Sequence, residues 1–332
     1  MLLDGRSAAD IAQAAGWLAA GELVAFPTET VYGLGADAGN DAAVAKIFAA
    51  KGRPGDHPLI VHVADAAAVP YFAADGIAVF AQRLIDTLWP GPLTVILPRR
   101  DGIAAAAAGG QASIGLRCPA HPVAQALLRA CAQAAPAVHG LAGPSANQFG
   151  RVSPTTAAHV QAGFDASLAV LDGGPCAVGI ESAIVDCTRD VPVLLRPGVL
   201  TRAQIEAACG QPLRLPEELD APAPRASGTL ESHYAPRARV RLMGARSLQA
   251  ALDVLGADAA HIAIYSRVIL RTVSPKVLRR RMPDDALEVA RQLFSVLRAF
   301  DDAGVRLIWV ETPPDAPEWE GVLDRLQRAA AG

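Results

Sequence analysis

The sequence predicts an α/β protein built from two domains joined by a linker. Short apolar segments of strand length alternate with amphipathic segments of helix length along most of the chain, a pattern typical of sheets covered by helices. A chain of 332 residues exceeds the usual size of one domain. Residues 211–228 carry four prolines and few large apolar side chains, which is typical of a linker.

Capping residues and apolar periodicity predict the elements of the first domain. Ser7, and then Asn40 or Asp41, can each begin a helix by accepting hydrogen bonds from its first backbone N–H groups. Ser153 followed by Pro154 is a third typical helix start. We expect strands at 22–26, 59–63, 93–97, 113–117, 168–171, 183–187 and 192–195, and helices at 7–20, 64–73, 76–88, 121–134 and 201–209.

The region after the linker repeats a simple strand and helix order. Strands are expected at 240–243, 261–265 and 305–310, and helices at 246–255, 284–299 and 317–330. This order predicts a small three-layer domain with a parallel sheet. The region contains neither a Gly-x-Gly-x-x-Gly nor a phosphate-loop motif.

Composition argues against several classes of protein. Net charge is −3, so no bulk basic character indicates nucleic-acid binding. The five cysteines are widely spaced and form no Cys-x-x-Cys pair, which favours reduced thiols in the cytoplasm over a zinc or redox motif. No apolar run of about 18 residues and no signal-peptide pattern is present, so we expect a cytoplasmic protein without a membrane span.

Five polar clusters interrupt the apolar strands of the first 200 residues. They supply cations, small hydroxyls, and glycines that allow a ligand to approach backbone amides. Cations and amide donors bind phosphates and carboxylates well. The clusters are 28–32; 51–54 with His62; 113–117 with 119–122; 143–147 with 151–154; and 173–174, 179–182 and 196–198.

The clusters lack a clear nucleophilic Ser/His/Asp set and lack metal-ligand spacing. Such a site is suited to positioning substrates and neutralising charge, which is how nucleotidyl transfer is mostly catalysed. The residues therefore predict an enzyme that acts on small anionic ligands.

Seven long segments occur in an order that resembles a known family. They are Phe-Pro-Thr-Glu-Thr-Val-Tyr-Gly-Leu-Gly at 26–35, Lys-Gly-Arg-Pro at 51–54, His-Pro-Leu-Ile-Val-His at 57–62, Trp-Pro-Gly-Pro-Leu-Thr at 89–94, Arg-Cys-Pro-Ala-His-Pro at 117–122, Pro-Ser-Ala-Asn at 144–147 and Leu-Arg-Pro-Gly at 195–198. The series resembles the YrdC-type domain of the threonylcarbamoyl-AMP synthase family over about residues 8–208. Ser-His-Tyr-Ala-Pro at 232–236 and Gly-Val-Leu-Asp-Arg-Leu at 321–326 are similar to the linker and the end of the longer, two-domain form.

The resemblance implies a fold and its boundaries. We expect a YrdC-like catalytic domain over 1–210, with a twisted mixed sheet, flanking helices and a concave active-site face. A linker or lid covers 211–238, and a small Rossmann-like three-layer domain covers 239–332.

The resemblance also implies an activity. The family condenses L-threonine, bicarbonate and ATP into threonylcarbamoyl-AMP and pyrophosphate, and Mg²⁺ is expected to accompany the ATP without a metal site in the protein. A partner machinery then transfers the group to tRNA; whether this chain itself makes a weak contact with tRNA stays open.

By similarity, each candidate residue has an expected role. Lys51 and Arg53 are the expected catalytic residues and face the phosphates. Threonine is expected at Thr28, His62, Arg117 and Ser182, and the nucleotide at Lys51, Arg53, Ser113, Ser145, Asn147, Ser153, Arg196 and Tyr234, with Tyr234 on a lid.

Several of these residues also have a purely structural explanation. Lys51 can offset a helix dipole, His62 can be a satisfied strand histidine, and Ser153 can be only a cap. Tyr234 can merely anchor the linker. Glu231 departs from the basic residue common in the family linker, and we expect its side chain to point outward, away from the triphosphate.

Three other functions compete with the synthase. A carbamoyl-adenylate-forming protein of hydrogenase maturation uses a similar domain, but its acylphosphatase-like part and its Cys-x-x-Cys motifs are not visible here. An RNA-binding module would use the clustered cations, although aromatic residues, which stack on bases, make up only 5% of the chain. A regulatory protein that binds nucleotide without catalysis is disfavoured by intact Lys51, Arg53 and Ser145.

Overall fold

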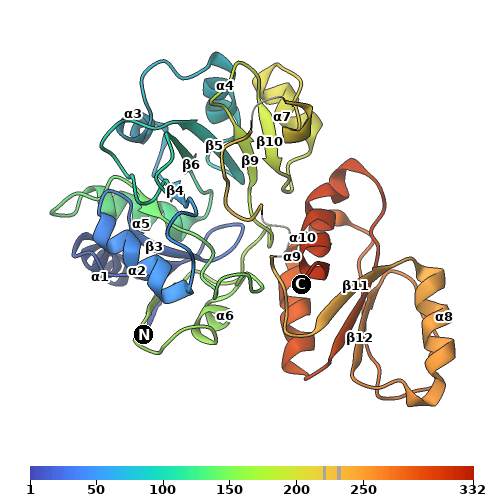
Figure 1. Cartoon of the computed structure of the whole chain (residues 1–332). Helices are drawn as coiled ribbons and strands as arrows, with labels where there is room; N and C mark the ends of the chain where they lie inside the picture. The colour runs from blue at the N-terminus through green and yellow to red at the C-terminus, as the bar shows by residue number, and fades with distance from the viewer. Residues whose placement is uncertain (220–221, 230–232) are drawn as a thin grey trace. The chain divides into compact units, whose positions relative to one another are not determined.

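In the computed structural model the chain forms two compact units (Figure 1). The structure describes residues 1–219, 222–229 and 233–332. The first unit comprises Met1–Phe149 and Ser153–Thr229, and the second comprises Gly150–Val152 and the described residues from 233 onward. The short segment Gly150–Val152 therefore belongs to the second unit although it lies in the middle of the chain, and Arg151 forms a β-bridge with Ala235.

A ten-stranded mixed sheet forms the centre of the first unit, in the order β1-β8-β2-β3-β7-β4-β6-β5-β9-β10. Its strands are β1 (Leu2–Asp4), β2 (Val24–Phe26), β3 (Gly33–Asp37), β4 (Ile60–His62), β5 (Leu93–Pro98), β6 (Ser113–Arg117), β7 (Leu141–Ala142), β8 (Ala169–Asp172), β9 (Ala183–Asp186) and β10 (Val193–Arg196). The flanking helices are α1 (Ala8–Ala19), α2 (Asp41–Lys51), α3 (Val69–Phe72), α4 (Val79–Leu88), α5 (Pro122–Ala132), α6 (Ala157–Gln161) and α7 (Arg202–Cys209). Single-turn 3-10 helices lie at Ala66–Ala68 and Pro216–Glu218.

The caps that begin three of these helices are those the sequence predicts. Ser7, Asn40 and Thr201 each accept a hydrogen bond from the backbone N–H three residues later. The predicted helix start at Ser153 is wrong, because its hydroxyl donates to Glu181 and helix α6 begins only after Thr156.

The second unit contains a four-stranded parallel sheet in the order β11-β14-β12-β13. Its strands are β11 (Arg239–Met243), β12 (Ile262–Ser266), β13 (Leu278–Arg281) and β14 (Leu307–Glu311), and its helices are α8 (Ala245–Leu255), α9 (Ala286–Asp302) and α10 (Glu320–Ala330). Short 3-10 helices lie at Gly256–Asp258 and Pro317–Trp319. Helix α8 covers one face and helices α9 and α10 cover the other, which gives the expected three layers (Figure 1).

Four strands of the structure were not predicted from the sequence, namely β1, β3, β7 and β13. Strand β3 reads Gly-Leu-Gly-Ala-Asp and lacks the β-branched residues that mark a strand. Gly35 leaves little room for a side chain, because a Cβ there would lie 3.0 Å from the Phe26 ring and from the Val24 carbonyl oxygen. Within the described residues, no helix has both the length and the apolar character needed to cross a bilayer.

Candidate active site

Register brings the candidate side chains to one end of the central strands. His62 on β4 is the direct partner of Arg117 on the parallel strand β6. Strand β5 runs antiparallel to β6, so its first residues, Leu93 and Thr94, lie at this same end. Ser182 immediately precedes β9, which runs parallel to β5. The sheet thus gathers an imidazole, a guanidinium and two hydroxyls from segments far apart in the sequence.

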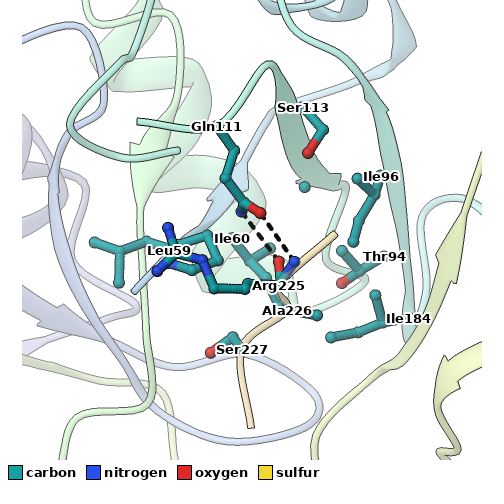
Figure 2. Close-up of a pocket in the computed structure, with 12 residues that line it drawn as sticks. Leu59, Ile60, Thr94, Ile96, Gln111, Ser113, Ile184, Arg225, Ala226 and Ser227 are labelled. Atoms are coloured by element: carbon teal, nitrogen blue, oxygen red, sulfur yellow. Dashed lines mark hydrogen bonds between the residues drawn. The ribbon is translucent and has the colours of Figure 1, made fainter. Parts of the chain in front are cut away.

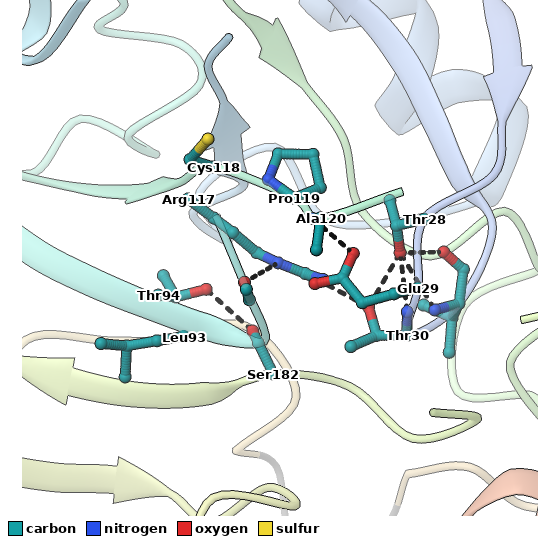
Figure 3. A network of polar contacts seen from close by, with 12 residues as sticks. Thr28, Glu29, Thr30, Leu93, Thr94, Arg117, Cys118, Pro119, Ala120 and Ser182 are labelled. Atoms are coloured by element: carbon teal, nitrogen blue, oxygen red, sulfur yellow. Dashed lines mark hydrogen bonds and ion pairs between the residues drawn. The ribbon is translucent and has the colours of Figure 1, made fainter. Parts of the chain in front are cut away.

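Arg117 is the centre of this group and is almost fully buried (Figure 3). Its Nη1 donates to Thr30 Oγ1 at 2.7 Å, and its Nε donates to the Gly91 carbonyl at 3.4 Å. Its Nη2 lies 2.7 Å from Glu29 Oε1, an ion pair whose side chains are only 4% and 10% exposed. The other oxygen of Glu29 accepts from the Ala120 backbone N–H at 3.1 Å.

Three buried polar atoms in this group lack a well-aligned hydrogen bond. Glu29 Oε1 and Arg117 Nη2 are close enough for an ion pair but lack hydrogen-bond geometry, and His62 Nδ1 has no hydrogen-bond partner in the described part of the chain. Buried polar groups are nearly always satisfied, and unsatisfied ones need an explanation. Because Glu29 Oε1 and Arg117 Nη2 contact each other, His62 Nδ1 is the atom of this group that a polar ligand would satisfy.

The imidazole of His62 is held in its neutral form. Burial, and then the nearby charge of Arg117, lower its pKa from 6.5 to about 3. The ring packs edge-on against Phe26, with centroids 5.5 Å apart. A neutral imidazole offers one donor and one acceptor, so His62 can hydrogen-bond a ligand without adding a second positive charge.

The lowered pKa of His62 predicts a pH-dependent stability. Between about pH 3 and pH 6.5 the unfolded chain binds a proton that folded His62 does not, so stability is lost as the pH falls below 6.5. From pH 6.5 to pH 5 this group is expected to remove about 1.5 kcal/mol from the free energy of unfolding. Urea unfolding of the wild type and of His62→Gln at both pH values checks this, and equal losses in the two proteins would contradict it.

Two threonines of one loop have different environments. The hydroxyl of Thr28 donates to the Val31 carbonyl at 2.6 Å and accepts from the backbone N–H groups of Thr30 and Val31. The hydrogen bonds of the Thr28 hydroxyl are therefore made within the loop. Thr30, which the sequence analysis did not single out, contacts Arg117 instead, and so does Glu29. Both lie in the 28–32 cluster, but only the folded turn shows which side chains face the arginine.

Ser182 connects this group to a second arginine. Its hydroxyl lies 2.8 Å from that of Thr94, another residue the sequence analysis did not name. Arg196 donates from Nε to the Ser182 carbonyl at 3.1 Å and from Nη2 to the Ser182 hydroxyl at 3.3 Å. Its Nη1 donates to the Ser227 carbonyl at 2.7 Å.

Residues 222–229, here called the strap, close a cavity beside this group (Figure 2). The cavity is lined by Ser113, Thr94 and the strap residues Arg225, Ala226 and Ser227, among others. Gln111 fixes the strap through two hydrogen bonds, one accepted from the Arg225 backbone N–H at 2.9 Å and one donated to its carbonyl at 3.1 Å. The side chain of Arg225 pairs with Asp56 at 2.6 Å.

Lys51 and Arg53 lie at and after the end of helix α2. Lys51 is buried, and its Nζ donates to the backbone carbonyls of Ser145, at 2.6 Å, and Asn147. Burial, and then the charge of Arg53, hold the pKa of this amine well below its usual value. Arg53 donates to the Pro58 carbonyl at 3.0 Å and stacks its guanidinium over the Phe149 ring. The structure thus brings together Lys51 and the loop that carries Ser145 and Asn147.

The remaining candidates have other surroundings. Ser153 is fully buried beside Glu181 in the first unit. Tyr234 belongs to the second unit, where its ring stacks on His233 and lies under the guanidinium of Arg325. Glu231 lies outside the described residues. Among the described residues no group of three or more His, Cys, Asp or Glu side chains is arranged to hold a metal ion.

Comparison with known proteins gives consistent results over the whole chain. Residues 17–198 match the family Sua5_yciO_yrdC, described as "Telomere recombination", and residues 200–331 match "Threonylcarbamoyl-AMP synthase, C-terminal domain". The threonylcarbamoyl-AMP synthase of Bacillus subtilis is 38% identical, covering 97% of this chain and 93% of its own, and that of Pyrococcus abyssi is 35% identical, covering 96% and 93%. The crystal structure of P. abyssi Sua5 complexed with L-threonine superposes with a TM-score of 0.88 at 34% identity, covering 99% of this chain and 97% of the other.

The fold, the site and these similarities define a two-domain enzyme of the YrdC type. The chain belongs to the threonylcarbamoyl-AMP synthase family, in the form that carries the additional C-terminal domain.

Proposed function

We propose that this protein is an L-threonylcarbamoyladenylate synthase, a nucleotidyltransferase that converts L-threonine, bicarbonate and ATP into threonylcarbamoyl-AMP and pyrophosphate. The observation that carries the proposal is the buried Arg117, paired with Glu29, together with His62 on the neighbouring strand, whose Nδ1 lacks a hydrogen-bond partner among the described residues. A related enzyme of the same fold has been solved with L-threonine.

The threonine end of the site follows from the geometry of Arg117. A guanidinium fork matches a carboxylate in shape and charge, so it is the natural partner for the carboxylate of threonine. The neutral ring of His62 and the hydroxyl of Ser182 offer polar partners for the threonine hydroxyl. The loop around Thr28 completes the pocket by holding Glu29 and Thr30 against the arginine.

The nucleotide end is assigned to the second set of residues. Lys51 and Arg53 supply the cations, and Ser113, Ser145, Asn147, Ser153 and Arg196 supply polar contacts to ATP, whose Mg²⁺ arrives with the substrate. In the reaction an oxygen of the N-carboxylated threonine forms a bond to the α-phosphorus, and the bond from that phosphorus to the departing pyrophosphate breaks. Because two anions must meet, preorganised cations lower the barrier.

The chemistry of the proposed product indicates which reaction consumes it. A threonylcarbamoyl-adenylate is an activated group donor, and a separate machinery that modifies tRNA is its expected consumer. We place the reaction in the cytoplasm, where reduced thiols such as the five unbridged, buried cysteines are stable.

Release of pyrophosphate tests the proposed function. It is measured with ATP, Mg²⁺, bicarbonate and each of the twenty amino acids in turn. We expect release that requires both threonine and bicarbonate. Release without threonine would indicate a carbamoyl-transferring or nucleotide-hydrolysing relative, and no release at all would favour a binding protein.

The hydrogen bonds that hold the strap are expected to affect the affinity for ATP. Gln111→Ala removes both side-chain hydrogen bonds to the Arg225 backbone, so we expect the Kd for ATP to rise by about three- to tenfold. Arg225→Ala is the matched control, because it keeps both backbone hydrogen bonds to Gln111 and removes an exposed ion pair, worth at most about 1 kcal/mol, and an exposed hydrogen bond of 3.3 Å to the Gly109 carbonyl. Calorimetric titration with ATP distinguishes the two variants, and an equal or larger effect of Arg225→Ala would contradict the prediction.

A further inference from the structure

A cationic segment of the second unit has no part in the proposed chemistry. Between Arg267 and Met282 the chain carries six basic residues and no acidic one, although the whole protein has a net charge of −3. The basic residues of this segment are Arg267, Arg271, Lys276, Arg279, Arg280 and Arg281.

Only two of these charges have a carboxylate partner among the described residues. Arg267 pairs with buried Glu311 at 2.7 Å, and Arg281 lies 3.4 Å from exposed Asp284. Arg279 donates to the Leu270 carbonyl at 3.3 Å and Arg280 to the Gln292 side chain at 3.4 Å, both neutral acceptors. The positive charge of the segment is thus largely uncompensated by the unit that carries it.

The same segment exposes aliphatic side chains beside the arginines. Val268, Ile269, Val273 and Leu278 are 44%, 85%, 78% and 39% exposed, which makes four of the ten exposed large apolar residues of the described chain. Val268 and Ile269 line a groove together with Ile264, Leu270 and the arginines 279–281. A concentration of exposed apolar side chains of this kind marks an interaction surface.

The arginines that line the groove belong to β13, a strand at the edge of the sheet. Strand β13 pairs with β12 alone in the order β11-β14-β12-β13, and all four of its residues are exposed. Arginines by themselves would simply protect this edge from unwanted strand pairing. That explanation leaves the exposed aliphatic residues at 268–273 without a role.

We infer that this groove, lined by 264–270 and 279–281, binds an extended acidic segment of a partner protein, which adds to β13 as a further strand. In such an arrangement acidic side chains two residues apart lie opposite Arg279 and Arg281, and apolar side chains further along the same face of the segment pack on Val268 and Ile269. RNA is a poorer match, since the groove has no aromatic side chain for base stacking and RNA has no aliphatic group to cover Ile269. The inference stands independently of the synthase activity.

The binding of a short peptide tests this inference. The probe is a fluorescein-labelled eight-residue peptide, Asp-Thr-Asp-Thr-Leu-Thr-Leu-Thr, which places its acidic and apolar side chains on one face of a strand, and the counterpart has lysine in place of aspartate. Fluorescence anisotropy with the full chain is expected to show saturable binding of the acidic peptide only. The double variant Arg279→Glu/Arg281→Glu, and separately Ile269→Ser, are each expected to raise the Kd at least tenfold.

The opposite edge of the same sheet provides the matched control. Strand β11 also carries two exposed arginines two residues apart, Arg239 and Arg241. Arg239→Glu/Arg241→Glu makes the same change of charge away from the groove and is expected to leave the Kd unchanged. Thermal unfolding of every variant shows whether the second unit is still folded.

Hydrogen exchange separates strand addition from diffuse attraction. Bound peptide is expected to slow exchange of the backbone amides of residues 278–281. The inference is overturned if the peptide does not bind at millimolar concentration, if both double variants weaken binding equally, or if no amide of β13 gains protection. It is also overturned if a single-stranded RNA binds these residues more tightly than the peptide in physiological salt.

Discussion

Arg117→Lys is expected to lower kcat/KM for threonine by at least about 100-fold. Arg117 reaches Thr30, Glu29 and Gly91 with three different nitrogens, and an ammonium cannot reproduce that planar fork. Lysine keeps a positive charge beside Glu29 but loses the planar set of donors that contacts Glu29, Thr30 and Gly91 together. The variant keeps the positive charge, so a fall in kcat/KM would reflect the lost geometry of the guanidinium and not a lost charge. Threonine-dependent release of pyrophosphate measures it.

Arg129→Lys is the control for this substitution. Arg129 is exposed on helix α5, where it donates to the Gln125 side chain at 3.0 Å, and its replacement is expected to leave the rate unchanged. If Arg117→Lys remains folded and retains more than about a fifth of the wild-type kcat/KM, Arg117 is not the carboxylate partner.

Lys51→Met is expected to lower turnover at least tenfold, with the larger part of the loss in kcat. The substitution removes a cation from the nucleotide end and also removes the two hydrogen bonds that hold the carbonyls of Ser145 and Asn147. Methionine fills nearly the same space, so the core around helix α2 is preserved. Steady-state pyrophosphate release at saturating threonine measures the change.

Lys46 provides the matched control on the same helix. Its ammonium lies near the surface, bonded to Glu22 at 2.9 Å and to the Gly21 carbonyl at 2.8 Å. Lys46→Met is expected to leave turnover unchanged. Near-wild-type activity in both Lys51→Met and Arg53→Ala would remove the proposed role of these cations.

The elements that could be predicted are those with local signals. Ser7, Asn40 and Thr201 cap helices because the reason for capping lies within four residues of each helix start. Ser153 carries the same local signal, yet a residue 28 positions away, Glu181, takes its hydroxyl. Strand β13 was missed because its three consecutive arginines hide any apolar alternation. In both cases a distant part of the chain determines the structure: Glu181 holds the Ser153 hydroxyl, and pairing with β12 forms β13.

The site was predictable as a set of segments but not as a set of contacts. Motifs indicated the loop with Thr28, but the turn directs the hydroxyl of Thr28 into the loop and that of Thr30 toward Arg117. In the same way, Thr94 gains its position beside Ser182 only through the pairing of β5 with β9. Residue types near a site follow from sequence, whereas their orientation depends on the assembled sheet.

The membership of Gly150–Val152 in the second unit has a consequence for truncation. The chain passes between the units three times, at 149–150, at 152–153 and after 229, so the C-terminal region is not joined through a single linker. A protein ending at residue 229 would leave the Gly150 carbonyl without the Ala235 N–H, 2.9 Å away, and the Val152 carbonyl without Arg298. A stable single-domain version of this chain therefore needs a redesigned loop at 150–152 as well as a stop codon.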